Sequence, residues 1–224
     1  LALSVQKVIV REIVMRKKIS LLTLIVVMIA FVSCKQASKN GNDNQQENLT
    51  AMKDSVKTVP VTDAVVIVLL AHPDINKSHE VEGVQVINIY DYPVAPDVYR
   101  DVVKQAKGIV YEFPFYWMSA PHLLKQWTDE VFMAFTQEGL IEGKEFMVVT
   151  TTGSEEAAYQ HDGRNKYTMS EYLRPYEGQA NHSKMIWNDP LVVYGNPQNA
   201  TVAEENLQKG KEEYKARLKA MVER

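Results

Sequence analysis

Three short segments of the chain carry residue types that suit the binding of a redox cofactor. Each follows an apolar run that ends abruptly: His72–Ser78, Phe113–Met118 and Thr151–Tyr159. Together they offer hydroxyl groups, an imidazole, aromatic rings and turn-forming backbone. A cleft lined by backbone amides, hydroxyls and aromatic rings suits a flat, anionic cofactor such as flavin mononucleotide (FMN). The residue types therefore suggest a cofactor site built from three loops.

Five apolar segments are predicted as the strands that position these loops. The first, AVVIVLL, is a continuous apolar run of the kind found in central parallel strands buried on both faces. The second alternates in polarity, and the third enters a β-forming run through a glycine. The predicted strands are Ala64–Leu70, Val84–Tyr90, Gly108–Phe113, Lys144–Thr151 and Met185–Tyr194, the last interrupted at Asp189-Pro190.

Segments with helical periodicity lie between these strands and after the last one. They span Pro96–Lys107, a stretch from Pro121 to Phe132, a stretch that begins at Thr168, and Thr201–Val222. Strands alternating with helices predict an α/β fold, a three-layer sandwich around a doubly wound five-stranded parallel sheet in the flavodoxin-like order 2-1-3-4-5. The carboxyl ends of such strands share one edge, where open α/β sheets bind ligands.

The stretch from Gly108 to Phe132 is central to this arrangement. Its strand breaks at Pro114, an aromatic loop follows, and the helical pattern begins at Pro121, which suits a first helical turn. Trp127 and Phe132 lie at helical spacing and are expected in the core. Tyr116 and Trp117 lie where the backbone leaves the core, so a binding role is favoured for them.

The connection between the first two strands does not fit the expected pattern. Only the residues from Ala71 to Gly83 are available, and a parallel crossover normally takes a dozen or more residues, usually including a helix. The first crossover helix is therefore predicted to be truncated or missing. One face of the sheet would then expose an apolar patch, covered by a partner subunit, the terminal helix or the linker.

The amino-terminal residues have the pattern of a secretory signal. Met15 is followed by three basic residues, an apolar run from Ile19 to Val32, and Ser33-Cys34. The segment Phe31–Cys34 resembles a bacterial lipobox, with Cys34 as the lipidated residue; an uncleaved anchor that ends at this cysteine is the alternative. Both interpretations place the rest of the chain in the cell envelope, tethered to a membrane. Residues 1–14 are expected to be upstream translation.

A polar segment, KQASKNGNDNQQEN, follows Cys34 and is predicted to be a solvated linker. The expected organisation is residues 1–33 as upstream sequence and signal peptide, 34–62 as the linker, and 63–224 as the folded domain. Cys34 is the only cysteine, which excludes an internal disulfide. Removal of residues 1–33 would change the net charge from −3 to −7, and an acidic domain without a basic cluster argues against nucleic acid as a partner.

Several motifs in the chain resemble those of the NAD(P)H:quinone oxidoreductases. That family includes bacterial modulator-of-drug-activity proteins and the ancillary subunits of glutathione-gated potassium efflux systems. Each motif is weak alone, but their order and spacing from about Val65 to Gly195 are specific. The motifs are Ala71-His72-Pro73, Lys77-Ser78, Phe113-Pro114-Phe115-Tyr116-Trp117, Pro121, Leu124-Lys125, Trp127, Asp129, Thr151-Thr152-Gly153, Ala158-Tyr159-Gln160, Gly163-Arg164-Asn165-Lys166-Tyr167-Thr168 and Leu173-Arg174-Pro175-Tyr176-Glu177.

The resemblance implies a homodimeric flavoprotein that passes hydride from NAD(P)H to flavin N5 and then to a quinone or similar electrophile. It implies FMN as the cofactor, with the dinucleotide FAD as the alternative, and roles for three groups of residues. Those that would hold the cofactor phosphate are His72, Asn76 and Ser78. Those that would line the isoalloxazine are Pro114, Phe115, Tyr116, Trp117 and Met118. Those that would hold its pyrimidine edge are Thr151, Thr152 and Gly153.

Two further residues are implied as catalytic. Tyr159 matches the family tyrosine near the N1–O2 side of the ring, where it would stabilise charge after hydride transfer. Asn165 stands where some family members have histidine, and it can form hydrogen bonds but cannot relay a proton by changing charge. Ser154 replaces a common second glycine. His122, His161 and His182 lack metal-ligand spacing, so no metal is expected.

Two alternatives to a free enzyme remain open from the sequence. A degenerate flavodoxin-like module that has lost its first crossover helix would bind a membrane partner without catalysis. An ancillary subunit of a transporter, such as a potassium efflux system, would regulate that partner. The first alternative is motivated by the short first crossover, because phosphate binding in this architecture relies on amides at the amino end of that helix. The second is motivated by the resemblance, since the family includes such ancillary subunits.

Overall fold

The computed structural model describes residues 56–72 and 81–224. The chain divides into two compact units, Leu1–Val56 and Lys57–Arg224, and the second contains all of the strands and helices discussed below. The predicted signal peptide, Cys34 and most of the linker lie outside the described residues. So do Asn76 and Ser78.

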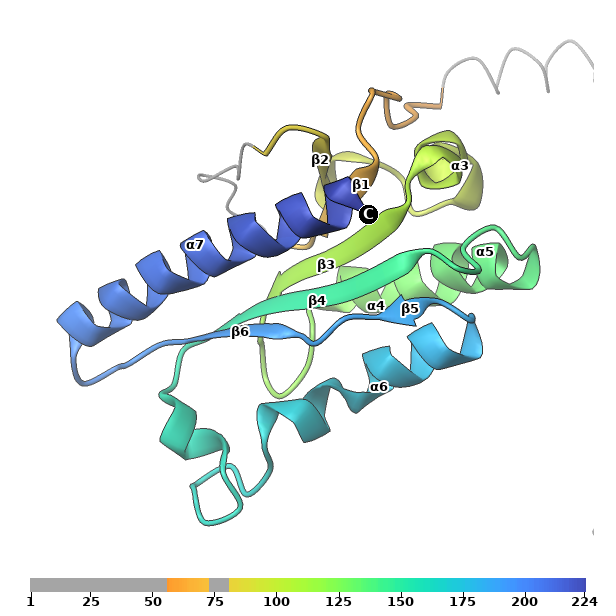
Figure 1. Cartoon of the computed structure of the whole chain (residues 1–224). Coiled ribbons are helices and arrows are strands. Elements are labelled where there is room, and N and C mark those ends of the chain that lie inside the picture. Colours follow the sequence, from red (N-terminus) through yellow and green to blue (C-terminus); the bar gives the residue numbers. More distant parts are fainter. Residues whose placement is uncertain (1–55, 73–80) are drawn as a thin grey trace, which may run out of the picture. The chain divides into compact units, whose positions relative to one another are not determined.

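A parallel β-sheet forms the centre of the second unit (Figure 1). The strand order is β2-β1-β3-β4-β5, and β6 also pairs with β4. The flavodoxin-like order predicted from the sequence is thus confirmed. Strands β5 and β6 pair with opposite ends of β4 and together correspond to the predicted fifth strand, with its interruption at Asp189-Pro190. The strands are β1 (Val66–Leu70), β2 (Val84–Asn88), β3 (Gly108–Pro114), β4 (Glu145–Thr152), β5 (Ile186–Trp187) and β6 (Leu191–Tyr194).

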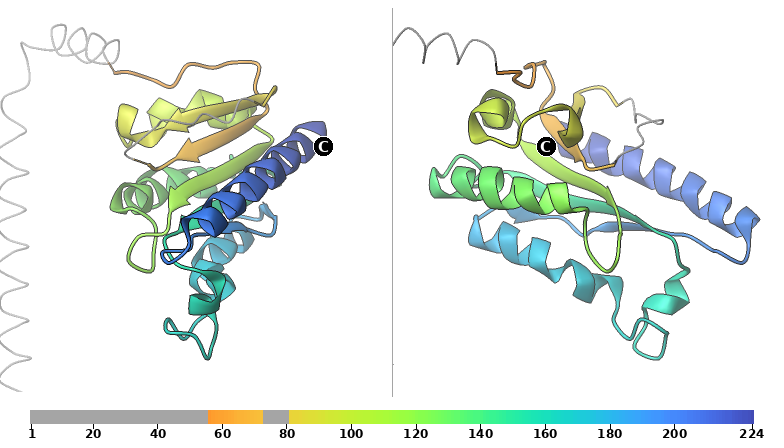
Figure 2. Two further views of the ribbon diagram at one scale, coloured as in Figure 1. Left: turned by 90° about the vertical axis from the view of Figure 1, so that its left-hand side faces the viewer. Right: turned by 180° about the vertical axis from the view of Figure 1, so that it is seen from behind.

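Helices cover both faces of the sheet unequally, as Figure 2 shows. One face carries α3 (Pro96–Gln105), α4 (His122–Trp127), α5 (Met133–Gln137) and α6 (Met169–His182), and a π-helical turn, η3 (Thr128–Phe132), joins α4 to α5. The other face carries α7 (Ala200–Glu223). Short 3₁₀ turns, η2 (Ile89–Asp91) and η4 (Glu156–Tyr159), follow β2 and β4. The described residues thus form the predicted three layers.

The strand residues alternate between two apolar clusters, one on each face. Every residue of β1 is buried, as expected for a central strand. On the side of α3 to α6, Trp127 is fully buried and packs edge-on against Tyr99 and Tyr111, with ring centroids 5.5 and 5.8 Å away. Phe132 is also buried, so the prediction that Trp127 and Phe132 belong to the core is confirmed.

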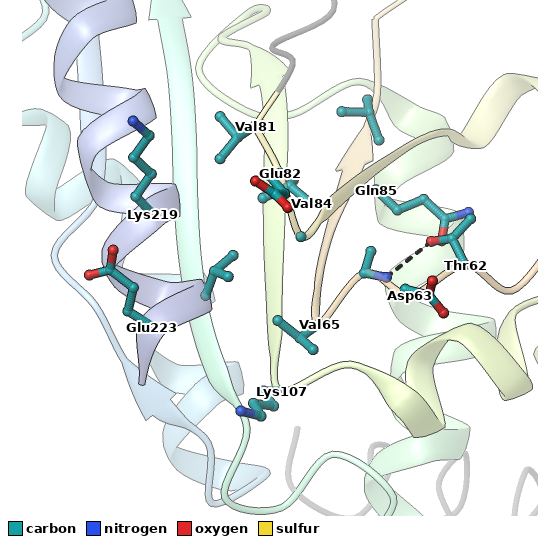
Figure 3. A pocket seen from close by; sticks show the side chains of 14 residues that line it. Thr62, Asp63, Val65, Val81, Glu82, Val84, Gln85, Lys107, Lys219 and Glu223 are labelled. Atoms are coloured by element: carbon teal, nitrogen blue, oxygen red, sulfur yellow. Dashed lines mark hydrogen bonds between the residues drawn. The ribbon is translucent and has the colours of Figure 1, made fainter.

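The face that carries α7 has a groove beside that helix (Figure 3). The groove has a volume of about 1050 Å³ and lies between α7 and the amino ends of β1 and β2. Its apolar lining comes from Val65, Val81, Val84, Val86 and Val222. This agrees with the prediction that a short first crossover leaves one face incompletely covered. The prediction that the first crossover helix is truncated or missing concerns residues 73–80, which lie outside the described residues.

Candidate functional site

The carboxyl ends of β1, β3 and β4 bring the three predicted loops to one edge of the sheet. Pro114 and Thr151 are register neighbours, and the Phe115 N–H donates to the Thr151 carbonyl at 2.8 Å. On the other side of β3, the Ala71 N–H donates to the Glu112 carbonyl at 2.9 Å, which places His72 at the same edge. The predicted convergence of the loops is therefore observed for every part that the structure describes.

The aromatic loop forms a tight two-residue turn. Tyr116 and Ser119 exchange backbone hydrogen bonds of 2.8 and 2.9 Å, and the residues between them have positive φ angles, 48° at Trp117 and 67° at Met118. Positive φ at both central positions defines a type I′ turn, which asparagine and glycine normally occupy. Large side chains in this conformation are uncommon, and such strain gathers at functional sites.

This turn presents binding groups to solvent. The Trp117 side chain is 95% exposed, and Tyr116 and Met118 are also exposed. The backbone N–H groups of Trp117 and Met118 donate to no residue in the ranges 56–72 and 81–224. Pro114 and Phe115, by contrast, are buried and support the turn from below. The turn therefore offers free backbone donors and an uncovered indole, as a planar ligand requires.

The loop after β4 is held by hydrogen bonds on its buried side and is exposed on its other side. The Thr152 hydroxyl donates to the Ser154 carbonyl at 2.7 Å, and the Gly195 N–H donates to the Thr152 carbonyl at 2.9 Å. Thr151 is exposed, whereas Thr152 is buried, so the Thr152 hydroxyl holds the loop. A Cβ placed on Gly153 would meet no atom within 4 Å. The protein itself thus leaves room at Gly153 for the close approach of a ligand.

Tyr159 lies in η4 and is buried below the aromatic loop. Its ring centroid is 5.9 Å from that of Phe115, 6.2 Å from Tyr172 and 6.1 Å from Tyr194. This cluster joins the loops after β3 and β4 to α6 and β6. The structure thus places Tyr159 in contact with the aromatic loop, while its predicted position near the N1–O2 side of a flavin stays a prediction.

Asn165 is held beside Tyr159 by its backbone. The Asn165 N–H donates to the Ala158 carbonyl at 3.0 Å, and the Asn165 carbonyl accepts from the Tyr172 hydroxyl at 3.1 Å. The segment before it folds back closely, since a Cβ on Gly163 would lie 2.2 Å from the Ala157 carbonyl oxygen. The loop that carries Asn165 is thus packed tightly against η4.

The amino end of α6 anchors the same loop. Thr168 and Glu171 form a capping box at the start of the helix that the sequence predicts from Thr168. Hydrogen bonds from the Thr168 backbone and hydroxyl, and then from His161, lower the pKa of Glu171 to about 2. Nearby, burial raises the pKa of Tyr176 to about 12, although contacts with the Ala120 backbone and the Ser119 side chain oppose that rise. Tyr176 therefore remains a neutral hydroxyl under the aromatic loop.

Sequence reasoning included Arg164 in one of the matched motifs but assigned it no role at this edge. The Arg164 guanidinium donates a hydrogen bond to the Ser154 hydroxyl and so joins the loop after β4 to the loop that carries Asn165. The replacement of a common glycine by Ser154 was visible in the sequence. Its contact with Arg164 was not, because the contact depends on how the loop folds back at Gly163.

The residues present fit a flavin at the ring end of the site. Free N–H groups in a preformed turn, an exposed aromatic side chain and the open space at Gly153 suit a planar ring with a polar edge. Of the residues predicted at the phosphate end, the structure describes His72 alone, and Asn76 and Ser78 lie outside its range. Residues 56–72 and 81–224 contain no group of three His, Cys, Asp or Glu side chains arranged to hold a metal ion. Within these ranges no helix has the length and apolarity needed to cross a bilayer.

Two curated proteins illustrate the sequence similarity of the chain. General stress protein 14 of Bacillus subtilis (strain 168) is 38% identical over 148 residues, which cover 58% of this chain and 85% of that protein. The glutathione-regulated potassium-efflux system ancillary protein KefG of Enterobacter sp. (strain 638) is 34% identical over 151 residues, covering 58% of this chain and 81% of KefG. Both matches cover most of the relative and a little over half of this chain, as expected if one domain is shared.

Solved structures show the same fold. General stress protein 14 of Treponema denticola, solved in complex with FMN, superposes with a TM-score of 0.62 at 24% identity and covers 72% of this chain and 99% of its own. An NADPH-quinone reductase from P. pentosaceus superposes with a TM-score of 0.55 at 29% identity and covers 65% and 95%. The sequence model of the family described as having a flavodoxin-like fold matches residues 28–218. The chain therefore belongs to the flavodoxin-like fold family.

Proposed function

We propose that this protein is a flavin-dependent oxidoreductase that transfers electrons from NAD(P)H to quinones or similar electrophiles. The observation that carries the proposal is the strained turn at Trp117 and Met118, whose N–H groups have no partner among the described residues and whose loop is joined through Phe115 and Thr151 to the loop that leaves open space at Gly153. The relatives named above support it, since one structure of this fold holds FMN and another is a quinone reductase. FMN is the proposed cofactor.

Each part of the site has a definite task in this proposal. The Trp117 and Met118 N–H groups would bind the polar central edge of the ring, and the backbone from Thr151 to Gly153 would bind its pyrimidine edge. The chemistry that a bound flavin supplies is two-electron transfer from reduced nicotinamide to the acceptor. Tyr159 would hold a hydroxyl near the charge that develops on the pyrimidine side. Asn165 would orient ligand groups by hydrogen bonds without taking up a proton.

The test is a flavin-binding and turnover measurement on the purified protein. We expect a yellow protein, or one that becomes yellow with added FMN, and NAD(P)H-dependent reduction of a water-soluble quinone. The same assay with NADH and NADPH in turn would identify the preferred donor, and added FAD would test the alternative cofactor. Clean, folded protein that stays colourless in excess FMN would contradict the proposal.

A second candidate function is that of an ancillary module on a membrane partner, either catalytic or degenerate. The similarity to KefG, which is named as an ancillary protein of a potassium-efflux system, favours this candidate. Mild detergent extraction followed by affinity capture of the tagged chain would distinguish the two functions. An ancillary module would co-purify with an integral membrane protein in a fixed ratio, and a free enzyme would not.

The location and assembly of the protein complete the proposal. The basic triplet, the apolar run and Cys34 support export and lipidation, so we place the protein in the cell envelope, anchored through lipid on Cys34. Metabolic labelling with an alkyne fatty acid should mark the wild type but not Cys34→Ser. A homodimer is proposed from the family resemblance, and light scattering of the soluble domain would test it against a monomer.

A further inference from the structure

Arg164 brings a positive charge to the candidate site, and like Arg174 in α6 it forms no ion pair with a carboxylate of the described residues. Arg100, Arg217 and Arg224 each form an ion pair with a glutamate. No carboxylate of the described segments lies within 4.0 Å of the Arg164 side-chain nitrogens. Its guanidinium donates a hydrogen bond to the neutral hydroxyl of Ser154, which directly follows the segment that would hold the pyrimidine edge of a flavin. An arginine remains protonated at every physiological pH.

The backbone around Arg164 is fixed on both sides. Before it, Gly163 packs so closely against η4 that a Cβ would lie 2.2 Å from the Ala157 carbonyl oxygen. After it, the Asn165 N–H donates to the Ala158 carbonyl at 3.0 Å. The hydroxyl of Ser154 then directs the side chain toward the loop after β4. Arg164 is an exposed residue, but its backbone is fixed on both sides and its guanidinium is held toward the loop after β4 by the hydrogen bond to Ser154.

From this arrangement we infer that Arg164 stabilises the reduced, anionic form of the flavin. This inference rests on the proposed function. When hydride is transferred, the nicotinamide C–H bond breaks with its electron pair, the hydrogen is bound to N5, and negative charge spreads over N1 and the C2 carbonyl oxygen. Arg164 makes and breaks no covalent bond. A fixed cation at that edge favours the charged product over the neutral oxidised ring.

Asn165 explains why such a charge is needed here. A histidine at that position would take up a proton and supply the compensating charge, whereas asparagine stays neutral. Arg164, the preceding residue, supplies a permanent charge from the same loop. The proposed role is thus electrostatic, and it differs from a purely structural role in one measurable way. A structural contact would strengthen the binding of oxidised and reduced flavin equally.

The experiment compares the two-electron midpoint potential of FMN bound to the purified full-length protein and to its variants. Arg164→Gln should bind reduced FMN at least tenfold more weakly relative to oxidised FMN, which lowers the potential by about 30 mV or more. Arg164→Lys should retain most of the wild-type potential, because the charge remains. Ser154→Gly, which removes the anchoring hydroxyl, should give an intermediate value.

Arg100→Gln is the matched control. It removes the same charge from α3, where Arg100 pairs with Glu138, and should leave the potential unchanged. An unchanged potential in Arg164→Gln would overturn the inference, and so would equal weakening of both redox forms. A higher KM for NADPH but not NADH at constant potential would do the same, because Arg164 would then bind the ribose phosphate. Failure of the wild type to bind FMN would overturn the proposed function together with this inference.

Discussion

The hydroxyl of Tyr214 in α7 donates a hydrogen bond to Oε2 of Glu112 in β3 at 2.9 Å, across 102 residues of sequence. Tyr214 is almost fully buried, and burial, reinforced by the nearby carboxylate, raises its pKa well above the ordinary value. Glu112 immediately precedes Phe113 and the aromatic loop. The bond therefore joins the terminal helix to the strand that carries the candidate site.

Replacement of Tyr214 by phenylalanine should destabilise the domain by about 1.5–3 kcal/mol, because the bond lost is one to a carboxylate. Urea unfolding at neutral pH, followed by circular dichroism, would measure the change. Tyr167→Phe is the control: Tyr167 is 57% exposed, and loss of its hydroxyl should change the unfolding free energy by less than about 0.5 kcal/mol. Equal effects of the two substitutions would contradict this account.

Glu171 should make stability depend on pH in the acid range. Its pKa is lowered from 4.5 to about 2, chiefly by the hydrogen bond from the Thr168 backbone. Because the folded-state pKa lies below the unfolded-state pKa, the stabilisation is fully present above about 4.5 and is lost as the pH falls toward 2. Thermal unfolding of the wild type and Glu171→Gln should therefore differ at neutral pH and converge below pH 4.5. If the difference in unfolding temperature between the wild type and Glu171→Gln stayed constant down to pH 2, titration of Glu171 would not be the cause of the pH dependence.

The exposed indole of Trp117 should matter for flavin binding but not for folding. Trp117→Ala should change the unfolding free energy by less than about 0.5 kcal/mol, since the side chain is 95% exposed. It should weaken FMN binding by about 1.5 kcal/mol, or roughly tenfold, through the loss of aromatic contact. Isothermal titration calorimetry would measure the affinity for FMN of Trp117→Ala and of Trp117→Phe, a control that retains an aromatic ring. Unchanged affinity in the alanine variant would show that the backbone alone binds the cofactor.

Gly163 should tolerate no side chain. A Cβ there would lie 2.2 Å from the Ala157 carbonyl oxygen, and backbone atoms cannot move aside as a flexible side chain can. Gly163→Ala should therefore cost about 1–3 kcal/mol of stability, as overpacking usually does. Gly178→Ala in α6 is the matched control, because a Cβ there meets nothing within 4 Å and alanine favours the helix by about 0.5–1 kcal/mol. The unfolding temperature should fall in Gly163→Ala and rise in Gly178→Ala.

Most of the fold was predictable because its apolar patterns are strong. The buried strand at β1 and the helix that begins after Thr168 were both predicted from such patterns, and both are confirmed. The errors are local. Strand β2 ends at Asn88, earlier than predicted, because the Asn88 side chain accepts from the Tyr90 N–H and starts η2. The π-helical turn after Trp127 interrupts a helix that the periodicity predicts as continuous.

The candidate site was predictable in its location but not in its details. Strand ends of a parallel sheet meet at one edge, so the convergence of the loops followed from topology. The type I′ turn did not, because Trp117 and Met118 are not the residues that normally indicate one. The contact between Arg164 and Ser154 depends on a loop that folds back over ten residues, and the sequence pattern does not predict how such a loop folds.

The layer formed by α7 has a consequence for synthesis of the chain. Val66, Val68 and Val110 pack on that side against Tyr214, Leu218 and Met221, which are translated only after all of the strands that α7 covers. A nascent chain can complete the opposite layer first, but the second apolar face of its sheet stays exposed until α7 has left the ribosome. Stop codons introduced within α7 should therefore yield chains that are recognised by chaperones and proteases, even though every predicted cofactor contact lies before this helix.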